Sequence, residues 1–257
     1  MKTIKISAIS ALIALVIIGA TLVNKSFASK KTEDLAGDGF AVLELFTSEG
    51  CSSCPPADEL LARIQSEAGE KPVYVLSYHV DYWDRQGWRD VFSNPLFSKR
   101  QYRYGKQFTG QVYTPQVIVN GKAEFVGSDE KASREALSAA LSGKPSTALL
   151  LKGQETSGKL KIDYAFRGDA KNDQLLIAVV EKHAISKVAS GENAGRTLTH
   201  SQIVRDLYTI DPERSGNGTK EISLPKGFDT QKWEIVGFMQ DRETGVIHAA
   251  ARTQFNN

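Results

Sequence analysis

The stretch LFTSEGCSSCPPADELL (residues 45–61) contains the only two cysteines of the 257-residue chain, Cys51 and Cys54. Residues 41–46 before it form a short apolar run between glycines, which is typical of a strand buried on both faces. After the second cysteine, apolar residues recur at helical spacing, with acidic residues in the opening turn where they favour the helix dipole. The helical positions are Ala57, Leu60, Leu61, Ile64 and Ala68. The order is therefore strand, cysteine turn, helix.

The pattern continues as an α/β unit. Residues 73–80 (VYVLSYHV) predict a second strand, which lies parallel to the first because a helix separates them. An aromatic-rich segment at about 81–112 predicts a helical insertion, with a helix opening at Asn94-Pro95. Two short β runs joined by Asn120-Gly121 then predict a hairpin. A closing helix over 128–141 completes the first predicted domain, residues 40–144.

The N-terminus is typical of an export signal. Lys2 and Lys5 precede the uncharged apolar run 6–23, and Ser26-Phe27-Ala28 supplies small residues suited to signal-peptidase cleavage. We therefore expect a signal peptide at 1–28, a polar linker at 29–39, and a periplasmic or secreted protein. The alternative is that the segment stays uncleaved and serves as the protein's membrane contact.

Composition narrows the function classes. The 32 basic and 30 acidic residues are interspersed and give a formal charge of +2, so nothing indicates a nucleic-acid partner. A single cysteine pair is too few for a disulfide framework, so the pair needs a local explanation. His183, His200 and His248 are scattered without metal-ligand spacing and are interpreted as ordinary residues. We expect no cofactor.

From residue 145 the sequence consists of short alternating runs separated by Gly, Asn, Asp and Pro. This pattern predicts a second domain, residues 145–257, built as a small all-β sandwich. Its segment from Gly191 to Gly195 is expected to be a long hairpin connection.

The order of these elements resembles the thioredoxin fold. More narrowly, the motifs LELFTSEGCSSCPPAD, YHVDYWD, YTPQVIVNG and GENAGRTLTHSQIVR resemble the secreted bacterial family known as domain of unknown function 1223. The resemblance implies that Cys51 is the attacking thiol and Cys54 the resolving thiol of a reversible disulfide. It also places Thr114-Pro115 at the cis-proline site, where Tyr113 and Thr114 would bind an extended substrate chain. The implied partners are protein thiols or disulfides of the cell envelope.

The sequence departs from the thioredoxin pattern near the cysteines. Gly50 replaces the tryptophan that precedes the first cysteine, and Leu45 occupies the position of a buried acid on the first strand. We therefore expect no proton relay from that strand. No basic residue lies between the cysteines and Glu49 is close, so an intermediate reduction potential is expected.

Two other functions remain open. Cys51, Cys54 and His79 could serve as soft ligands for Cu(I). Alternatively, the cysteines form a permanent structural bridge in a binding module whose loop from Gly191 to Arg196 docks a partner. His79 itself could be a general base, a metal ligand, or a histidine hydrogen-bonded at a strand end with Asp81 capping the next turn.

Overall fold

The computed structural model describes residues 39–108, 110–213 and 215–255. They form an eight-stranded sheet, a four-stranded sheet and three α-helices, which confirms a mixed α/β class. The predicted signal peptide and almost all of the predicted linker lie outside the described residues. Within the described part of the chain, no helix has the length and apolar character needed to cross a membrane.

The N-terminal part contains the predicted strands and helices. Its elements are β1 (Ala41–Thr47), α2 (Pro55–Ala68), β2 (Val73–His79), the 3-10 helix η1 (Asp81–Trp83), α3 (Pro95–Gln107), β3 (Gln116–Val119), β4 (Ala123–Val126) and α4 (Glu130–Leu141). Strand β1 pairs parallel with β2 and antiparallel with β3, which gives the order β2-β1-β3-β4. The β3–β4 turn uses Asn120 and Gly121, both with positive φ, as the hairpin signal predicts.

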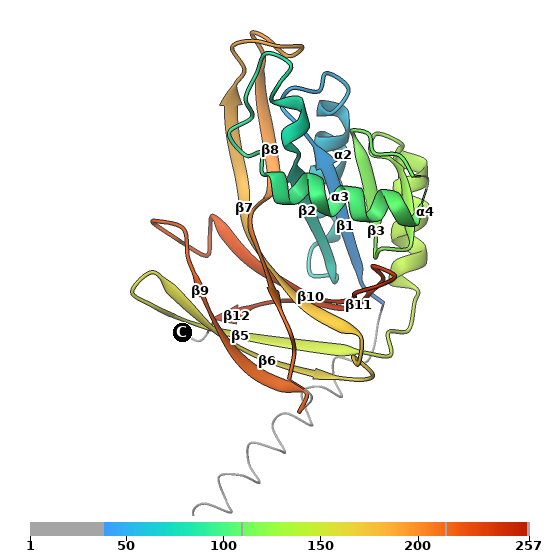
Figure 1. The fold of residues 1–257 in the computed structure, drawn as a ribbon, viewed down its shortest axis with the longest axis vertical. Coiled ribbons are helices and arrows are strands. Elements are labelled where there is room, and N and C mark those ends of the chain that lie inside the picture. The colour runs from blue at the N-terminus through green and yellow to red at the C-terminus, as the bar shows by residue number, and fades with distance from the viewer. Residues whose placement is uncertain (1–38, 109, 214, 256–257) are drawn as a thin grey trace, which may run out of the picture.

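The C-terminal part is all β. Its strands are β5 (Ala148–Thr156), β6 (Lys159–Arg167), β7 (Asp173–Lys187), β8 (Thr197–Ile210), β9 (Asn217–Ser223), β10 (Trp233–Asp241), β11 (Ile247–Arg252) and β12 (Gln254–Phe255). Four of them continue the N-terminal sheet, in the order β11-β10-β7-β8-β2-β1-β3-β4. The other four form the second sheet. Figure 1 shows the long β7 and β8 running from the second sheet up to β2.

The junction between the two parts is a strand pairing that the sequence did not predict. Ser77 on β2 pairs in parallel with Ile203 on β8, and the Ser77 hydroxyl donates to the Ser201 carbonyl at 2.9 Å. Every residue of β2 is buried. An unpaired outer edge of so apolar a strand would leave backbone groups without partners, and β8 supplies them. The sequence pattern changes from α/β to all β near residue 145, but the N-terminal and C-terminal parts both contribute strands to the eight-stranded sheet.

Apolar side chains pack on both faces of this sheet. Helices α2 and α4 cover one face of β1–β3, and α3 covers the other, where its aromatic residues Phe97 and Tyr104 are buried. A third cluster fills the space between the two sheets, as in a β-sandwich.

A buried ion pair fixes α3 to the sheet. Glu44 points away from α2, as strand alternation predicts, and Arg100 Nε donates to its Oε1 at 2.6 Å. The Tyr104 hydroxyl donates to the other oxygen of the same carboxylate. Both members of the ion pair are almost completely removed from solvent, so each needs the other to remain charged there.

Candidate functional site: the cysteine turn

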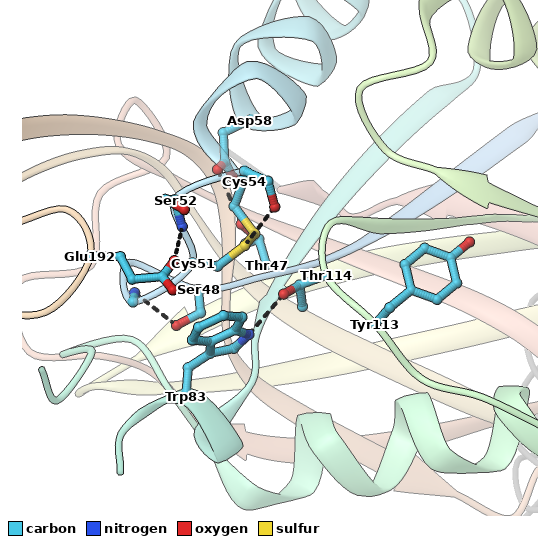
Figure 2. The surroundings of a disulfide bond; sticks show 12 residues. Thr47, Ser48, Cys51, Ser52, Cys54, Asp58, Trp83, Tyr113, Thr114 and Glu192 are labelled. Atoms are coloured by element: carbon cyan, nitrogen blue, oxygen red, sulfur yellow. Dashed lines mark hydrogen bonds between the residues drawn. A yellow bond between two sulfur atoms is a disulfide. The ribbon is translucent and has the colours of Figure 1, made fainter. Parts of the chain in front are cut away.

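Cys51 and Cys54 form a disulfide at the start of α2 (Figure 2). The turn begins at the carboxyl end of β1, where Cys51 N donates to the Ser48 carbonyl at 3.1 Å. The side chains of both cysteines are buried, whereas Ser52 and Ser53 between them are exposed. A disulfide in this protein was expected from the resemblance and is confirmed.

The double proline sets the position of Cys54. Pro55 and Pro56 occupy the first two positions of α2, where a missing N–H removes no helical hydrogen bond. Cys54 is the N-cap residue and already has helical torsion angles, φ −77° and ψ −39°. Its carbonyl accepts from Ala57 N at 2.9 Å and from Asp58 N at 3.1 Å. Cys54 is therefore held rigidly in the first turn of the helix.

The Thr114-Pro115 bond is cis. Trp83 Nε1 donates to Thr114 Oγ1 at 2.8 Å, which links the edge of the predicted substrate site to the 3-10 helix (Figure 2). The Tyr113 hydroxyl donates to Glu124 Oε2 at 2.7 Å, and Figure 2 shows its ring pointing away from the disulfide. Of the two predicted substrate-binding residues, Thr114 lies toward the cysteines and the Tyr113 side chain does not.

The connection between β7 and β8 packs directly on the cysteine turn. Asn193 is fully buried, and its Nδ2 donates to the carbonyls of Glu49 at 2.8 Å and Cys51 at 3.0 Å. Next to it, the Glu192 carboxylate accepts from Ser52 N at 3.0 Å. Arg196 Nη1 donates to Asn193 Oδ1 at 2.7 Å and completes the support. The loop that the binding-module hypothesis assigned to a partner contacts the same chain's cysteine turn.

Glu49 is a buried carboxylate two residues before Cys51. Trp88 Nε1 donates to its Oε2 at 2.6 Å, Ser186 donates to Oε1, and His200 Nε2 lies 3.3 Å from Oε1. Burial acts to raise the pKa of Glu49, but the hydrogen bonds from His200, Ser186 and Trp88 outweigh it and hold the pKa below its usual value. Glu49 is therefore ionised at neutral pH.

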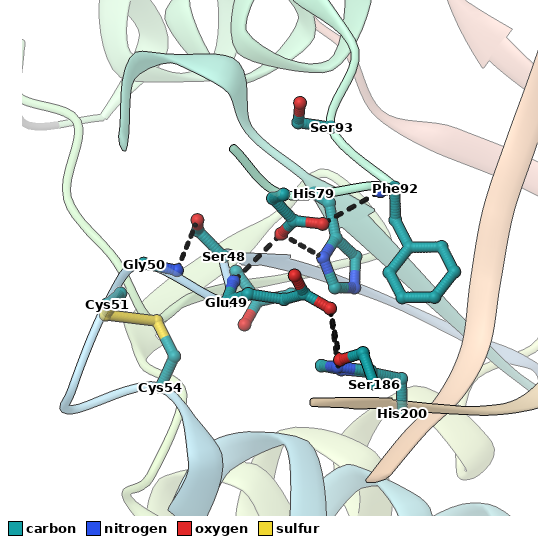
Figure 3. A network of polar contacts seen from close by, with 12 residues as sticks. Ser48, Glu49, Gly50, Cys51, Cys54, His79, Phe92, Ser93, Ser186 and His200 are labelled. Carbon is teal, nitrogen blue, oxygen red and sulfur yellow. Dashed lines mark hydrogen bonds and ion pairs between the residues drawn. A yellow bond between two sulfur atoms is a disulfide. The ribbon is translucent and has the colours of Figure 1, made fainter. Parts of the chain in front are cut away.

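A histidine pair lies behind Glu49 (Figure 3). His79 Nδ1 is 2.6 Å from Asp90 Oδ2, which also accepts from Glu49 N at 2.8 Å. The rings of His79 and His200 meet edge to face with centroids 5.0 Å apart. Among the described residues, His79 Nε2 and His200 Nδ1 are buried without a hydrogen-bond partner. Two basic groups thus share a desolvated space with two carboxylates.

The His79–Asp90 contact shifts both pKa values in opposite directions. Burial acts to lower the pKa of His79, but the charge and hydrogen bond of Asp90 outweigh it and raise the pKa above its usual value. Burial acts to raise the pKa of Asp90, but His79 and the N–H groups of Glu49 and Phe92 lower it overall. The contact therefore favours the ionic form of the pair, a protonated His79 beside an ionised Asp90.

Asp58 completes the set of ionisable groups around the turn. It lies on α2 four residues after Cys54, and Thr47 Oγ1 donates to its Oδ2 at 3.1 Å. Burial raises the pKa of Asp58 to about 6, while the positive charges of His79 and His200 and the Thr47 hydrogen bond oppose the rise. Asp58 does not stand out in the sequence, because an acid in the opening turn of a helix is explained by a favourable contact with the helix dipole.

The structure thus brings together residues that the sequence treated separately. His79 is hydrogen-bonded at a strand end, one of the three roles considered for it, and His200, interpreted as ordinary, is its neighbour. In the part of the chain that is described, no group of three or more His, Cys, Asp or Glu side chains is arranged to hold a metal ion. The Cu(I) site with Cys51, Cys54 and His79 remains a prediction from sequence.

Comparisons with known proteins give a family and a structural relative. The family model described as Protein of unknown function (DUF1223) matches residues 42–240. A crystal structure of a protein from Agrobacterium tumefaciens is similar, with a TM-score of 0.65 and 25% identity over 86% of this chain and 100% of that chain. A domain of the outer membrane lipoprotein Omp28 from Porphyromonas gingivalis matches at a TM-score of 0.26 and 13% identity, covering 44% of this chain and 91% of that chain. No curated protein matches the sequence.

Proposed function

Because the chain belongs to the family described as Protein of unknown function (DUF1223), we propose its function from the site itself: an exported thiol-disulfide oxidoreductase-like protein. In this proposal Cys51 attacks a substrate disulfide and Cys54 resolves the resulting mixed disulfide. The observation that carries the proposal is the Cys51–Cys54 bridge in the first turn of α2, surrounded by ionisable side chains.

The position of Cys51 suits the attacking role. Free N–H groups and the dipole at a helix N-terminus favour a thiolate, which is the nucleophilic form of cysteine. The nearby carboxylates of Glu49 and Glu192 work against the thiolate. These opposing influences support the intermediate reduction potential expected from the sequence.

The thioredoxin-like assignment of residues 40–144 is part of the proposal. It is supported by the order β2-β1-β3-β4, with β1 and β2 parallel and β3 and β4 antiparallel. Helices on both faces and a cysteine turn between β1 and α2 agree with it. The site roles of Thr114 and Pro115 are also part of the proposal.

Export and the partners also belong to the proposal. A signal peptide at residues 1–28 would deliver the protein to the periplasm or the medium, where thiols meet an oxidising environment. The partners would be protein thiols or disulfides of the cell envelope. N-terminal sequencing of protein recovered from the periplasm should begin at residue 29, and protein recovered with residues 6–23 still attached would contradict cleavage.

A trapping experiment tests the exchange activity. Cys54→Ser should accumulate mixed disulfides on Cys51 in cells, because the resolving thiol is gone. The variant with both cysteines replaced by serine is the control and should form none. If Cys54→Ser forms no adduct and the reduced wild-type protein reduces no model disulfide, the proposed function is wrong.

One observation favours the structural bridge as a second candidate. Cys51 is only 1% exposed, and the β7–β8 loop is hydrogen-bonded to its turn. A permanent bridge would have a reduction potential below about −300 mV, whereas catalytic pairs lie between roughly −270 and −120 mV. Equilibration of the Cys51–Cys54 pair with glutathione and dithiothreitol buffers separates the two.

A further inference from the structure

Asp58 lies one helical turn after Cys54 (Figure 2). Because Cys54 has helical torsion angles and its carbonyl accepts from Asp58 N, the two side chains have the i, i+4 relation. Residues in that relation lie on one face of a helix with Cβ atoms about 5–6 Å apart. The Thr47 hydroxyl at the end of β1 donates to the Asp58 carboxylate and fixes its position. Asp58 and Cys54 are thus neighbours on one face of the first turn of α2.

Cys54 needs a proton acceptor if it resolves a mixed disulfide. Its side chain is fully buried, so water cannot take the proton directly. A buried thiol keeps its proton because desolvation disfavours the thiolate. Resolution therefore depends on a base that the protein provides within the site.

Four carboxylates surround the turn, and Glu192 among them is exposed to solvent on the β7–β8 loop. Of the other three, Asp58 is the one with an oxygen that accepts no hydrogen bond from the described residues. Both oxygens of Glu49 accept hydrogen bonds, from Trp88 on one and Ser186 on the other. Both oxygens of Asp90 are likewise occupied, by Phe92 N and by His79 with Glu49 N. Asp58 Oδ2 accepts from Thr47, and Oδ1 has no hydrogen bond within the described residues.

The electrostatic surroundings suit Asp58 to gain and lose a proton near neutral pH. His79 from β2 and His200 from β8 stabilise its anion, and Asp90 from the segment before α3 opposes it. Burial is the largest influence and brings the pKa of Asp58 to about 6. A general base works best when its pKa lies near the operating pH. Asp58 is then mostly ionised at pH 7 and ready to accept.

We propose that Asp58 accepts the proton of the Cys54 thiol when Cys54 resolves the mixed disulfide on Cys51. The inference rests on the exchange activity proposed above. In this step a bond forms between the two cysteine sulfurs and the bond from Cys51 to the substrate sulfur breaks. The electron pair leaves on the substrate sulfur as a thiolate, the cysteine pair is oxidised, and the proton moves to Asp58. In the reverse direction Asp58 returns the proton to Cys54.

Ellman's reagent, an aromatic disulfide, tests the step with the reduced full-length protein. With less than one equivalent of reagent, attack by Cys51 releases a first coloured thiolate, and closure by Cys54 releases a second. Asp58→Asn should slow the second release about 100-fold at pH 7, the scale of general-base catalysis, and leave the first unchanged. The wild-type rate of the second release should rise through an inflection near pH 6, which the variant loses. Glu59→Gln, an exposed neighbour on α2, is the matched control and should change neither release.

Thr47→Val provides an independent variant should Asp58→Asn fold poorly. It removes the hydrogen bond that lowers the pKa of Asp58, so the inflection should move to higher pH. An unshifted inflection in Thr47→Val, or equal rates of both releases in Asp58→Asn and wild type, overturns the role of Asp58. Equal slowing of both releases overturns it as well. A wild-type protein that never releases the second thiolate refutes the exchange activity instead.

Discussion

Replacing Asn193 by alanine should loosen the loop that supports the cysteine turn. Asn193 makes three side-chain hydrogen bonds, to the carbonyls of Glu49 and Cys51 and from Arg196, and it is fully buried. Each such bond contributes about 1 kcal/mol net, and the two carbonyls would be left buried without this donor. We expect the free energy of unfolding to fall by about 3 kcal/mol. For a protein of this size that corresponds to a midpoint lower by about 6–12 °C.

Urea denaturation of the oxidised protein measures this loss. Asn217→Ala is the control, because Asn217 is exposed and its Nδ2 makes a single 3.3 Å bond to the Ser215 carbonyl. In the reduced protein, Asn193→Ala should also speed alkylation of Cys51 by iodoacetamide, because the turn is no longer held under the loop. A loss below about 1 kcal/mol, no larger than that of the control, would refute the support that we assign to Asn193.

Three further predictions test other parts of the structure. Arg100→Met should lower the free energy of unfolding, measured by urea denaturation, by about 3–5 kcal/mol, because it leaves the buried charge of Glu44 without its cation. The double variant Glu44→Gln, Arg100→Met should recover part of that loss. The raised pKa of His79 predicts stability that is fully present below pH of about 6.5 and lost as the pH rises through the folded-state pKa, so His79→Gln should flatten the slope of unfolding free energy against pH above about 6.5. The lowered pKa of Asp90 contributes stability that is present above pH of about 3.9 and lost in more acidic solution. Glu192→Gln keeps an acceptor for the Ser52 N–H but removes a negative charge, so the thiolate absorbance of Cys51 should titrate at lower pH and the reduction potential of the cysteine pair should rise. An unchanged titration would mean that the charge of this carboxylate is fully screened from Cys51.

The local elements of the N-terminal part could be predicted because their signals are local. Apolar residues at helical spacing after Cys54 indicate a helix, and Asn120-Gly121 indicates a hairpin, without help from the rest of the chain. The burial of β1 on both faces was also visible in its apolar run. These features depend on the chemistry of a few adjacent residues.

The site depends on contacts between residues far apart, and no local pattern specifies those. His79 and His200 are 121 positions apart in the sequence, and their rings meet only because β8 pairs with β2. In the sequence, Asn193 looks like an ordinary turn residue, because its role depends on the packing of the β7–β8 loop on the cysteine turn. Gly50 is explained in the same way, since a Cβ there would lie 3.2 Å from the Cβ of Trp83. The indole beside the turn thus comes from the segment after β2.

The pairing of β2 with β8 also determines the order in which the protein can mature. The cysteines and β2 leave the ribosome more than 100 residues before β8, so the apolar edge of β2 has no partner during that interval. A chain that ends at residue 144 keeps this edge open permanently and presents a ready template for intermolecular strand addition. We therefore expect that the cysteine-bearing half does not fold as an independent domain. We expect that soluble production and cooperative unfolding both require β8, which covers the edge of β2.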